Sequence, residues 1–320
     1  MSSSILSIYQ LKILPNEWLI EAFDKKWFKV FLPTDCGGLQ YSLREGLEVL
    51  YQTAKRHGGL GWVINLGAGA GYFSHCLNED VAISIYRSYN SVIAGSGATT
   101  GTATEYNDGF LINGEWKYCT GAAHSSAYTI TAILKNGDKK SFVLMPEQVT
   151  LIDQWNGFGL KPTSSFTIKV TNAWVPNYLK FDIDIRNSFK NYSLHKIPFF
   201  IFAKFCMLAS LSGILDCYLS YISEMGYKIQ NRILNEFQLI KLTHQQLLEK
   251  WQKLSLEFDK NDQQLINFNF NEEFSNTIYY IYQLACAIYY KGGMIMADES
   301  QLIHWAWRDL LMACQHYLLK

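Results

Sequence analysis

The stretch from Asn113 to Gly121 constrains the fold of this 320-residue chain more than any other part of its sequence. It reads Asn-Gly-Glu-Trp-Lys-Tyr-Cys-Thr-Gly, and Asn-Gly is the dipeptide most typical of a two-residue β-hairpin turn. We therefore predict a hairpin with its turn at Asn113-Gly114, followed by a strand that carries two aromatic rings and ends in a hydroxyl group. Such a surface can stack on a planar ligand and hydrogen-bond its edge. The alternative is ordinary cross-strand packing of the rings.

Around this stretch, the pattern changes from helix to strand and back to helix. Residues 42–56 carry leucines at helical spacing, and a glycine-rich run follows at 60–71. For this run we favour tight helix packing over ligand contact, because each glycine costs an isolated helix about 1 kcal/mol relative to alanine. Further strands are predicted at 128–134, 141–145 and 166–170, the first two joined by a turn at Asn136-Gly137-Asp138.

The order of these patterns predicts an α+β chain in three parts. An N-terminal helical domain covers 1–91, a central β-barrel-like or sandwich-like domain covers 92–185, and a helical domain covers 186–320. The last part has four helical patterns that could form an antiparallel four-helix bundle. They lie at 197–225, 232–258, 272–290 and 301–319, with a polar loop at 259–271.

Composition excludes several classes of protein. The 28 Lys and Arg residues balance 28 Asp and Glu residues, so no basic surface is left for nucleic acid. The seven scattered cysteines form no CxxC motif, which indicates reduced intracellular thiols rather than a disulfide framework or a zinc site. No other group has metal-ligand spacing, so we predict no metal. The low charged fraction of 18% leads us to expect self-association.

One apolar run, 197–215, approaches the length of a membrane-spanning helix. Lys204 lies near its middle, where insertion of a charge costs roughly 2.5–3.5 kcal/mol. The N-terminus also lacks the basic start and apolar run of a signal peptide. We therefore predict a buried helix at 197–215 and a soluble, cytoplasmic protein.

Four short motifs follow one another along the chain. They are Pro33-x-x-Cys36-Gly37-Gly38; Gly114-x-Trp116-x-Tyr118-x-Thr120-Gly121; Trp155-x-x-x-Gly159-Leu160-x-x-Thr163-x-Ser165, followed by Val175-Pro176; and Trp307-Arg308-Asp309-Leu310, followed by His316. In this order they resemble the acyl-CoA dehydrogenase superfamily, and the last motif resembles its flavin-dependent monooxygenase branch. The resemblance covers most of the chain, from about Lys26 onward. Two features depart from it: the chain before Pro33 is short, and Trp305 stands where the branch usually has an arginine.

This resemblance implies a bound flavin, either FMN or FAD. It implies that Trp116 and Tyr118 shape a wall against the flavin ring and that Thr120 donates a hydrogen bond toward the N5 atom. Thr163 and Ser165 would bind the phosphate or the pyrimidine edge through hydroxyl and backbone N–H groups.

The resemblance also implies a homo-oligomer, a dimer or a tetramer. Arg232 stands where related proteins reach the cofactor phosphate of a neighbouring subunit, and the alternative for it is a solvated helix charge. A separate flavin reductase is a further expected partner, because the chain has no nicotinamide-binding βαβ unit.

The last helical pattern decides the reaction type. Arg308, Met312 and His316 are four residues apart, so we predict that they share one helical face. By the resemblance, a dehydrogenase carries a glutamate base near this place, which Gln315 and His316 occupy here. A histidine exchanges a proton near neutral pH, so His316 joins Thr120 as a candidate catalytic residue, in the role of a base. The alternative is a histidine that only interacts with the last carbonyl groups of the helix.

Substrate contacts are predicted for Tyr72, His75, His124 and Met312. Tyr72 and His75 follow the glycine-rich run that would line the substrate pocket, and His124 comes soon after the predicted flavin strand. For both histidines we favour a packed or solvated side chain over ligand contact.

The leading hypothesis is a monooxygenase that uses reduced flavin and oxygen on a small aromatic or apolar substrate. Two alternatives stay open. One is an acyl-CoA dehydrogenase that oxidises an acyl thioester. The other is a degenerate member that binds flavin without catalysis or serves only as a scaffold.

Overall fold

The computed structural model describes residues 2–260 and 272–320. The helices before the strands are α1 (Ser2–Gln10), α2 (Asn16–Asp24), α3 (Leu43–Arg56), α4 (Gly58–Gly69) and α5 (Glu79–Tyr86). Those after the strands are α6 (Phe199–Ser223), α7 (Tyr227–Asp259), α8 (Glu272–Gly292), α9 (Met294–Ala297) and α10 (Leu302–Ala313). In the predicted loop 259–271, Asp259 ends α7, and residues 261–271 lie outside the described part of the chain.

The strands form a seven-stranded sheet in the order β5-β6-β2-β1-β3-β4-β7. Their bounds are β1 (Ile93–Tyr106), β2 (Gly109–Cys119), β3 (Ala127–Leu134), β4 (Lys139–Leu144), β5 (Thr150–Ile152), β6 (Phe166–Pro176) and β7 (Lys180–Phe181). Strands β1 and β3 are parallel, whereas the other neighbours in this sheet are antiparallel. The predicted α+β class and the order of helices, sheet and helices are therefore confirmed.

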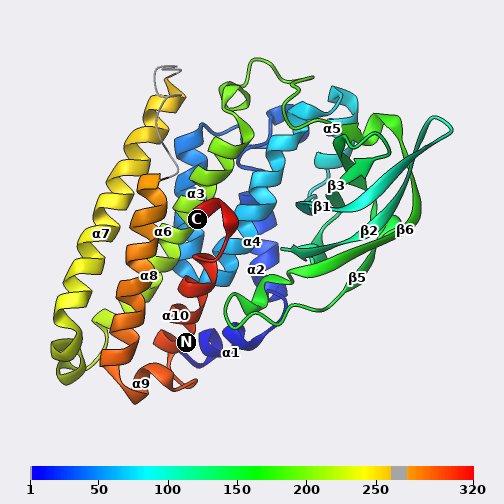
Figure 1. Cartoon of the computed structure of the whole chain (residues 1–320). Coiled ribbons are helices and arrows are strands. Elements are labelled where there is room, and N and C mark those ends of the chain that lie inside the picture. Colours follow the sequence, from blue (N-terminus) through cyan, green and yellow to red (C-terminus); the bar gives the residue numbers. More distant parts are fainter. Residues whose placement is uncertain (1, 261–271) are drawn as a thin grey trace.

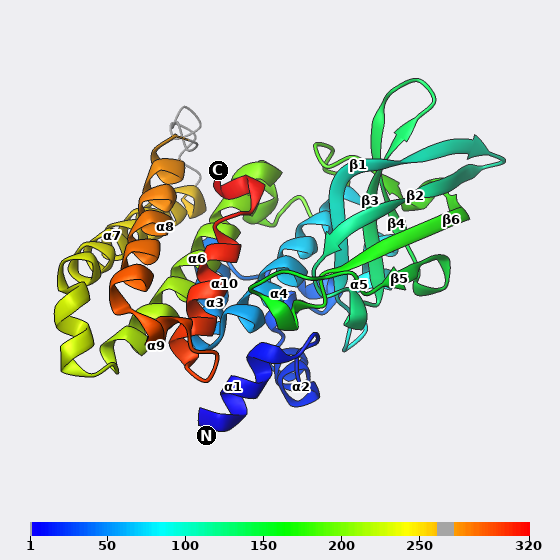
Figure 2. The same cartoon turned by 60° about the horizontal axis from the view of Figure 1, so that its bottom comes forward.

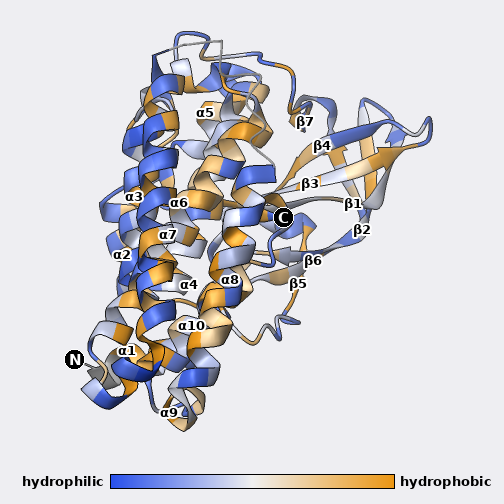
Figure 3. Cartoon of the chain, turned by 60° about the vertical axis from the view of Figure 1, so that its left-hand side comes forward, coloured by the Kyte–Doolittle hydropathy of each residue, from blue (hydrophilic) through white to orange (hydrophobic). Residues whose placement is uncertain are grey.

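The sheet lies at one side of the molecule and α7 and α8 at the other, with α3, α4, α6 and α10 between them (Figure 1 and Figure 2). Helix α6 packs against helices from both ends of the chain, α3 and α4 as well as α7 and α10. Hydrophobic residues follow α6, whereas α3 and α7 turn hydrophilic residues outward (Figure 3). The C-terminal helices thus share one core with α3 and α4, and a separate four-helix bundle stays a prediction.

Among the described residues, α6 is the helix that is long and apolar enough to cross a membrane, and 72% of its most apolar window is buried inside the protein. Core helices commonly share this length and composition. The burial agrees with the predicted core helix at 197–215.

The predicted hairpin turn at Asn113-Gly114 is wrong, because both residues lie inside β2. The chain turns earlier, at residues 107–108, between the paired residues Tyr106 and Gly109. Gly114 instead faces Gly101 of β1, and a Cβ on Gly114 would come within 2.5 Å of the Gly101 Cα atom. Glycine in a strand can mark close backbone approach as well as a turn, and the Asn-Gly pair here marks close approach.

The second predicted hairpin and the predicted helix at 42–56 agree with the structure, whereas the helix predicted at 301–319 ends at Ala313. Strands β3 and β4 form the second predicted hairpin, with Gly137 at a φ of 90° in its turn. Helix α3 begins with a capping box in which Ser42 Oγ accepts the Glu45 N–H and the Glu45 carboxylate accepts the Ser42 N–H.

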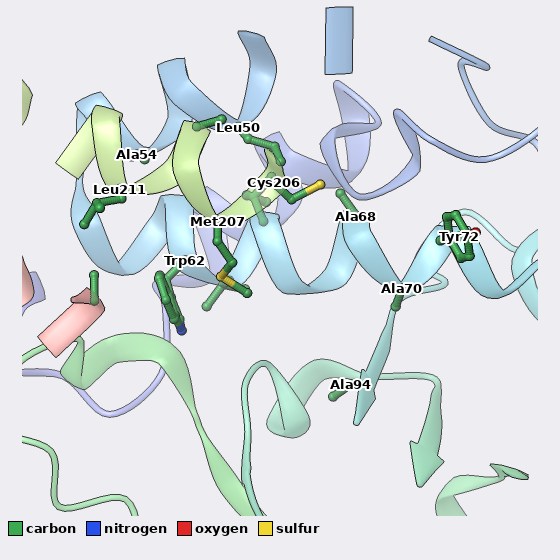
Figure 4. Close-up of a cluster of buried hydrophobic side chains, with 14 of the residues drawn as sticks. Leu50, Ala54, Trp62, Ala68, Ala70, Tyr72, Ala94, Cys206, Met207 and Leu211 are labelled. Atoms are coloured by element: carbon green, nitrogen blue, oxygen red, sulfur yellow. The ribbon is translucent and has the colours of Figure 1, made fainter. Parts of the chain in front are cut away.

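The glycine-rich run forms α4 and packs tightly, as we predict. A Cβ on Gly61 would lie 2.2 Å from the Ala54 Cα atom of α3, and one on Gly67 would lie 2.6 Å from the Phe28 ring. Figure 4 shows this close packing, with Ala54 and the α6 side chains Met207 and Leu211 around α4. Gly69 differs, since a Cβ there would meet nothing within 4 Å.

Two identical substitutions in α4 are expected to have opposite effects. Gly61→Ala should destabilise the protein by about 1–3 kcal/mol, because the methyl group meets backbone that cannot move aside. Gly69→Ala should stabilise it by up to about 1 kcal/mol, because helix propensity improves without a clash. Urea unfolding of both variants checks the pair, and a loss of stability in Gly69→Ala would contradict the packing described here.

Candidate functional site

Three predicted cofactor residues meet where β2 ends and β6 begins. Thr120 Oγ1 lies 2.9 Å from Ser165 Oγ, which lies 2.9 Å from Thr163 Oγ1. The pairing of Cys119 in β2 with Phe166 in β6 brings the two segments side by side. All three side chains are buried, so the structure forms a chain of hydroxyl groups with Thr120 at one end.

The backbone beside this hydroxyl chain is strained. Leu160 and Ser164 have positive φ angles of 51° and 40°, which cost roughly 1–3 kcal/mol each and gather at ligand sites. The Gly121 N–H donates to the Thr163 carbonyl at 2.9 Å, which fixes the two segments to each other. Ser164 Oγ is fully buried and has no hydrogen-bond partner. A buried hydroxyl without a partner adds to the cost of this loop conformation.

Aromatic rings flank the hydroxyl chain. Tyr118 is 67% exposed and has a φ of 65°, at the irregularity in β2 pairing between Trp116 and Cys119. Its ring meets the Trp155 ring edge-on at 5.8 Å, and Trp155 Nε1 donates to the Leu160 carbonyl at 2.9 Å. Tyr118 and Trp155 therefore offer ring surface next to the buried hydroxyls. Trp155 belongs to the third motif, but the motif alone predicts no role for it.

Trp116 does not have the position that we predict for it. Its side chain is 0% exposed, and its Nε1 donates to the Thr131 carbonyl at 2.9 Å. The ring lies over Gly101 and Gly114, whose missing Cβ atoms make room for it. Protein atoms thus cover the Trp116 ring, which makes cross-strand packing the better interpretation and gives a cofactor no ring face to contact.

His316 lies beyond the end of α10, so the predicted helical face shared with Arg308 and Met312 is wrong for His316. The helix ends at Ala313, and Tyr317–Leu319 form a short 3-10 helix that His316 precedes. The His316 ring meets the Trp62 ring of α4 edge-on at 5.7 Å. Met312 is partly buried against the core.

The proton position on His316 follows from its contacts. Burial lowers the pKa of His316 to about 4, so the ring is neutral at pH 7. Its Nδ1 accepts the Leu318 N–H at 3.4 Å, which puts the ring proton on Nε2. In this tautomer His316 presents an N–H donor, and the predicted base role would require the opposite tautomer.

Helix α4 connects His316 with the hydroxyl chain. Trp62 contacts the His316 ring, and the next residue, Val63, comes within 3.9 Å of the Cβ position of Gly121. Gly121 directly follows Thr120. One stretch of α4 therefore runs between the two candidate catalytic residues.

The predicted substrate residues Tyr72 and His75 are buried in a separate cluster. The Tyr72 hydroxyl donates to the Ile197 carbonyl at 2.7 Å. The His75 ring stacks on His195 with 4.0 Å between centroids, and burial lowers the pKa of His75 to about 4. This packing agrees with the packed histidine that we favour, and a substrate contact for Tyr72 and His75 stays a prediction.

His124 and Arg232 have different surroundings. Both ring nitrogens of His124 lack partners, and its Nε2 lies 3.3 Å from the Cβ position of Gly121, so His124 sits beside the end of β2. Arg232 is exposed on α7, on the side of the helices away from the sheet, and donates to the Lys228 carbonyl at 3.4 Å (Figure 1). The structure therefore does not bring Arg232 together with the other predicted cofactor residues of the same chain.

In the part of the chain that the structure describes, neither a metal-ligand cluster nor the groove between α3, α6 and α7 includes the predicted site residues. Within residues 2–260 and 272–320, no group of three or more His, Cys, Asp or Glu side chains could hold a metal ion. A groove of about 390 Å³ lies between α3, α6 and α7, and its lining includes Tyr51, Asp216 and His244 but none of the predicted site residues.

Comparison with solved structures shows that the chain has the acyl-CoA dehydrogenase-like fold. It superposes on 3-HSA hydroxylase from Rhodococcus sp. RHA1 with a TM-score of 0.88, at 15% identity, covering 100% of this chain and 89% of that one. The TM-score with the HsaA monooxygenase from Mycobacterium tuberculosis is 0.85, at 18% identity, and the match covers 100% of this chain and 90% of that one. Butyryl-CoA dehydrogenase from Megasphaera elsdenii gives 0.81, at 12% identity, covering 98% and 89%.

Sequence comparison finds related oxygenase subunits. No protein-family model matches the chain. It is 26% identical over 173 residues to the oxygenase subunit HsaA of a flavin-dependent monooxygenase from Mycobacterium tuberculosis, covering 52% of this chain and 44% of that one. It is 28% identical over 152 residues to indole-3-acetate monooxygenase from Pseudomonas putida, covering 46% and 39%. The matches span less than half the length of these relatives, and they confirm the resemblance to the monooxygenase branch.

Proposed function

We propose that this chain is the oxygenase component of a two-component flavin-dependent monooxygenase that acts on a small aromatic or apolar substrate. The observation that carries the proposal is the hydroxyl chain of Thr120, Ser165 and Thr163, which joins the two motifs that resemble flavin-binding strands. The related oxygenase subunits support it. When bound, reduced flavin would supply the electrons that activate oxygen.

The residues of this chain would hold the flavin between the sheet and α4. Tyr118 and Trp155 would contact the ring, and the hydroxyl chain of Thr163, Ser165 and Thr120 would hydrogen-bond its polar edge through Thr120. His316, whose ring meets Trp62, would hold a proton at Nε2. Trp62 and the neighbouring helices would exclude water from the substrate.

The proposal includes the wider setting of the enzyme. We expect a separate reductase, a cytoplasmic location, and a homo-oligomer in which Arg232 reaches the cofactor of another copy. We also retain the division at 1–91, 92–185 and 186–320, with a four-helix bundle in the last part, as part of the proposal.

The test is an anaerobic titration of the purified protein with reduced FMN and reduced FAD, followed by rapid mixing with oxygen. Binding, and then a transient absorbance distinct from oxidised and reduced flavin, supports the monooxygenase. Binding without such a transient, together with flavin reduction by an acyl thioester, would support the dehydrogenase alternative. A protein that binds neither flavin would instead be the degenerate, non-catalytic member.

Thr120→Val is expected to weaken flavin binding about tenfold, because the substitution removes a hydroxyl and leaves Ser165 Oγ with only Thr163 of its two hydroxyl partners. Thr102→Val is the matched control, since Thr102 is an exposed threonine in β1 of the same sheet. The titration above measures both dissociation constants. Equal losses in the two variants would show that the effect comes from the sheet and not from the hydroxyl chain.

A further inference from the structure

Asp309 in α10 is a buried acidic residue to which the proposed function gives no role. It is the one acidic side chain among the described residues that is buried as a whole, with 1% of its surface exposed. A carboxylate inside a protein is costly unless its oxygen atoms accept hydrogen bonds. The partners of Asp309 therefore show what this residue holds in place.

The Asp309 carboxylate holds a backbone group of the third motif. Its Oδ1 accepts the Leu160 N–H at 2.6 Å. Its Oδ2 lies against the start of α4, where a Cβ on Gly58 would come within 2.5 Å. The positive end of the α4 dipole favours a negative charge at this place. Asp309 thus bonds Leu160 through Oδ1 and packs against the first turn of α4 through Oδ2, which accepts no hydrogen bond there.

Arg308 holds the same loop from the neighbouring position. Its Nε donates a hydrogen bond to the Phe158 carbonyl. Between the two contacts, Gly159 passes so close to α10 that a Cβ would lie 2.1 Å from the Arg308 carbonyl oxygen. Arg308 and Asp309 therefore hydrogen-bond the backbone of residues 158–160 at both ends.

Further hydrogen bonds connect Leu160 to the candidate flavin site. The Leu160 carbonyl accepts Trp155 Nε1 at 2.9 Å and Thr163 Oγ1 at 2.7 Å. Thr163 is the inner member of the hydroxyl chain that leads through Ser165 to Thr120. Leu160 thus connects Asp309 both to the exposed aromatic pair and to the hydroxyl chain.

We propose that Arg308 and Asp309 form a clamp that positions the 155–165 segment for flavin binding, with Asp309 as a positioning residue that acts through Leu160. The link to flavin rests on the proposed function, whereas the clamp itself rests on the contacts described above. The charged form of Asp309 makes the stronger bond to the Leu160 N–H, so the clamp is tightest when Asp309 is ionised.

This dependence on charge falls in an accessible pH range. Burial raises the pKa of Asp309 to about 7. The titratable and charged groups that interact with it are Tyr9 of α1, Cys217 of α6 and Arg308 of α10. His57 before α4 and Tyr221 of α6 lie next to Tyr9. Burial raises the pKa of both tyrosines, raises that of Cys217 to about 12, and lowers that of His57 to about 3. Asp309 is therefore the group in this cluster that changes charge between pH 6 and pH 8.

Hydrogen exchange tests the clamp without any ligand. Asp309→Asn keeps the shape and the Oδ1 acceptor but removes the charge, and it should speed amide exchange in residues 158–165 at pH 8. Asp216→Asn is the matched control, because the Asp216 carboxylate accepts the Tyr51 hydroxyl at 2.7 Å and pairs with Lys55, away from this segment. Unchanged exchange in Asp309→Asn would overturn the clamp. Arg308→Gln, which alters a less buried side chain, is the second variant and should act in the same direction.

Flavin titration at pH 6 and pH 8 tests the positioning role. Asp309→Asn serves as the reference, because protonation of the flavin itself affects both proteins equally. Relative to this variant, the wild type should bind flavin about tenfold more tightly at pH 8 than at pH 6. Equal affinity and equal pH dependence in the two proteins would overturn the role. If the wild type binds no flavin, the proposed function fails, and hydrogen exchange alone decides the clamp.

Discussion

Acidification from pH 7 to pH 4 is expected to remove several kcal/mol from the free energy of unfolding of this protein. Burial lowers the pKa of His57 to about 3 and that of His75 to about 4, and burial with the adjacent His75 lowers the pKa of His195 to about 3. An unfolded histidine titrates at about 6.5, so the unfolded chain binds protons that the folded chain does not. Stability is therefore present above pH 6.5 and is lost as the pH falls, at about 1.4 kcal/mol per histidine and pH unit.

Urea unfolding at intervals from pH 8 to pH 4 measures this loss, and His57→Asn isolates one contribution. His57 caps α4 by accepting the Gly59 N–H at its Nδ1, 3.1 Å away. Asparagine is also a preferred N-cap, so the variant should keep the cap while removing the titration. The free energy of unfolding of the variant should fall less steeply on acidification. The difference in slope should correspond to about one fewer proton bound on unfolding. An unchanged slope would contradict the buried, neutral state of His57.

Asp309 acts in the opposite direction over the same range. Its folded pKa of about 7 lies above the unfolded value of about 4, so the stability that it contributes falls as the pH rises from 4 to 7. These three histidines, together with His124, His244 and His316, whose pKa burial also lowers, outweigh one carboxylate, so the net stability still rises with pH. The Asp309→Asn variant should accordingly lose stability more steeply on acidification than the wild type.

Local patterns predicted most of the helices and strands, and they failed where one residue type has two uses. An Asn-Gly pair such as Asn113-Gly114 is typical of a turn. Here, however, the glycine lets two strands and the Trp116 ring approach each other. Only the tertiary partner, Gly101 in β1, distinguishes these uses. The same holds for α4, where Gly61 serves close packing and Gly69 does not.

The motifs located the candidate site better than they assigned roles within it. Thr120 lies 45 residues before Ser165 in the sequence, and it comes together with Ser165 and Thr163 through the pairing of β2 and β6. Trp116 and Tyr118 are predicted to share one role, but Trp116 is buried and Tyr118 is exposed, with an irregularity in strand pairing between Trp116 and Cys119 that alternation does not reveal. Asp309 belongs to the fourth motif, but its proposed positioning role depends on its hydrogen bond to Leu160, and no spacing rule predicts that partner.

His316→Ala is expected to lower the rate of substrate oxygenation about 100-fold or more, with little change in flavin affinity. The expectation follows from the place of His316 against Trp62, next to the stretch of α4 that reaches Gly121. A group that acts only on the reacting atoms affects the chemical step, whereas loss of packing would weaken flavin binding as well. Single-turnover oxygenation with prebound reduced flavin separates the two effects.

His316→Gln and His316→Asn then show whether the histidine donates or accepts the proton. A glutamine amide places an N–H donor near the position of Nε2, but it cannot act as a base. Because Nδ1 accepts the Leu318 N–H, the structure favours the donor, and His316→Gln should keep a rate within about tenfold of the wild type. His316→Asn reaches only the Nδ1 position and should be as slow as His316→Ala. If the glutamine and asparagine variants are equally slow, the histidine acts as the base that its sequence position predicts, through the opposite tautomer.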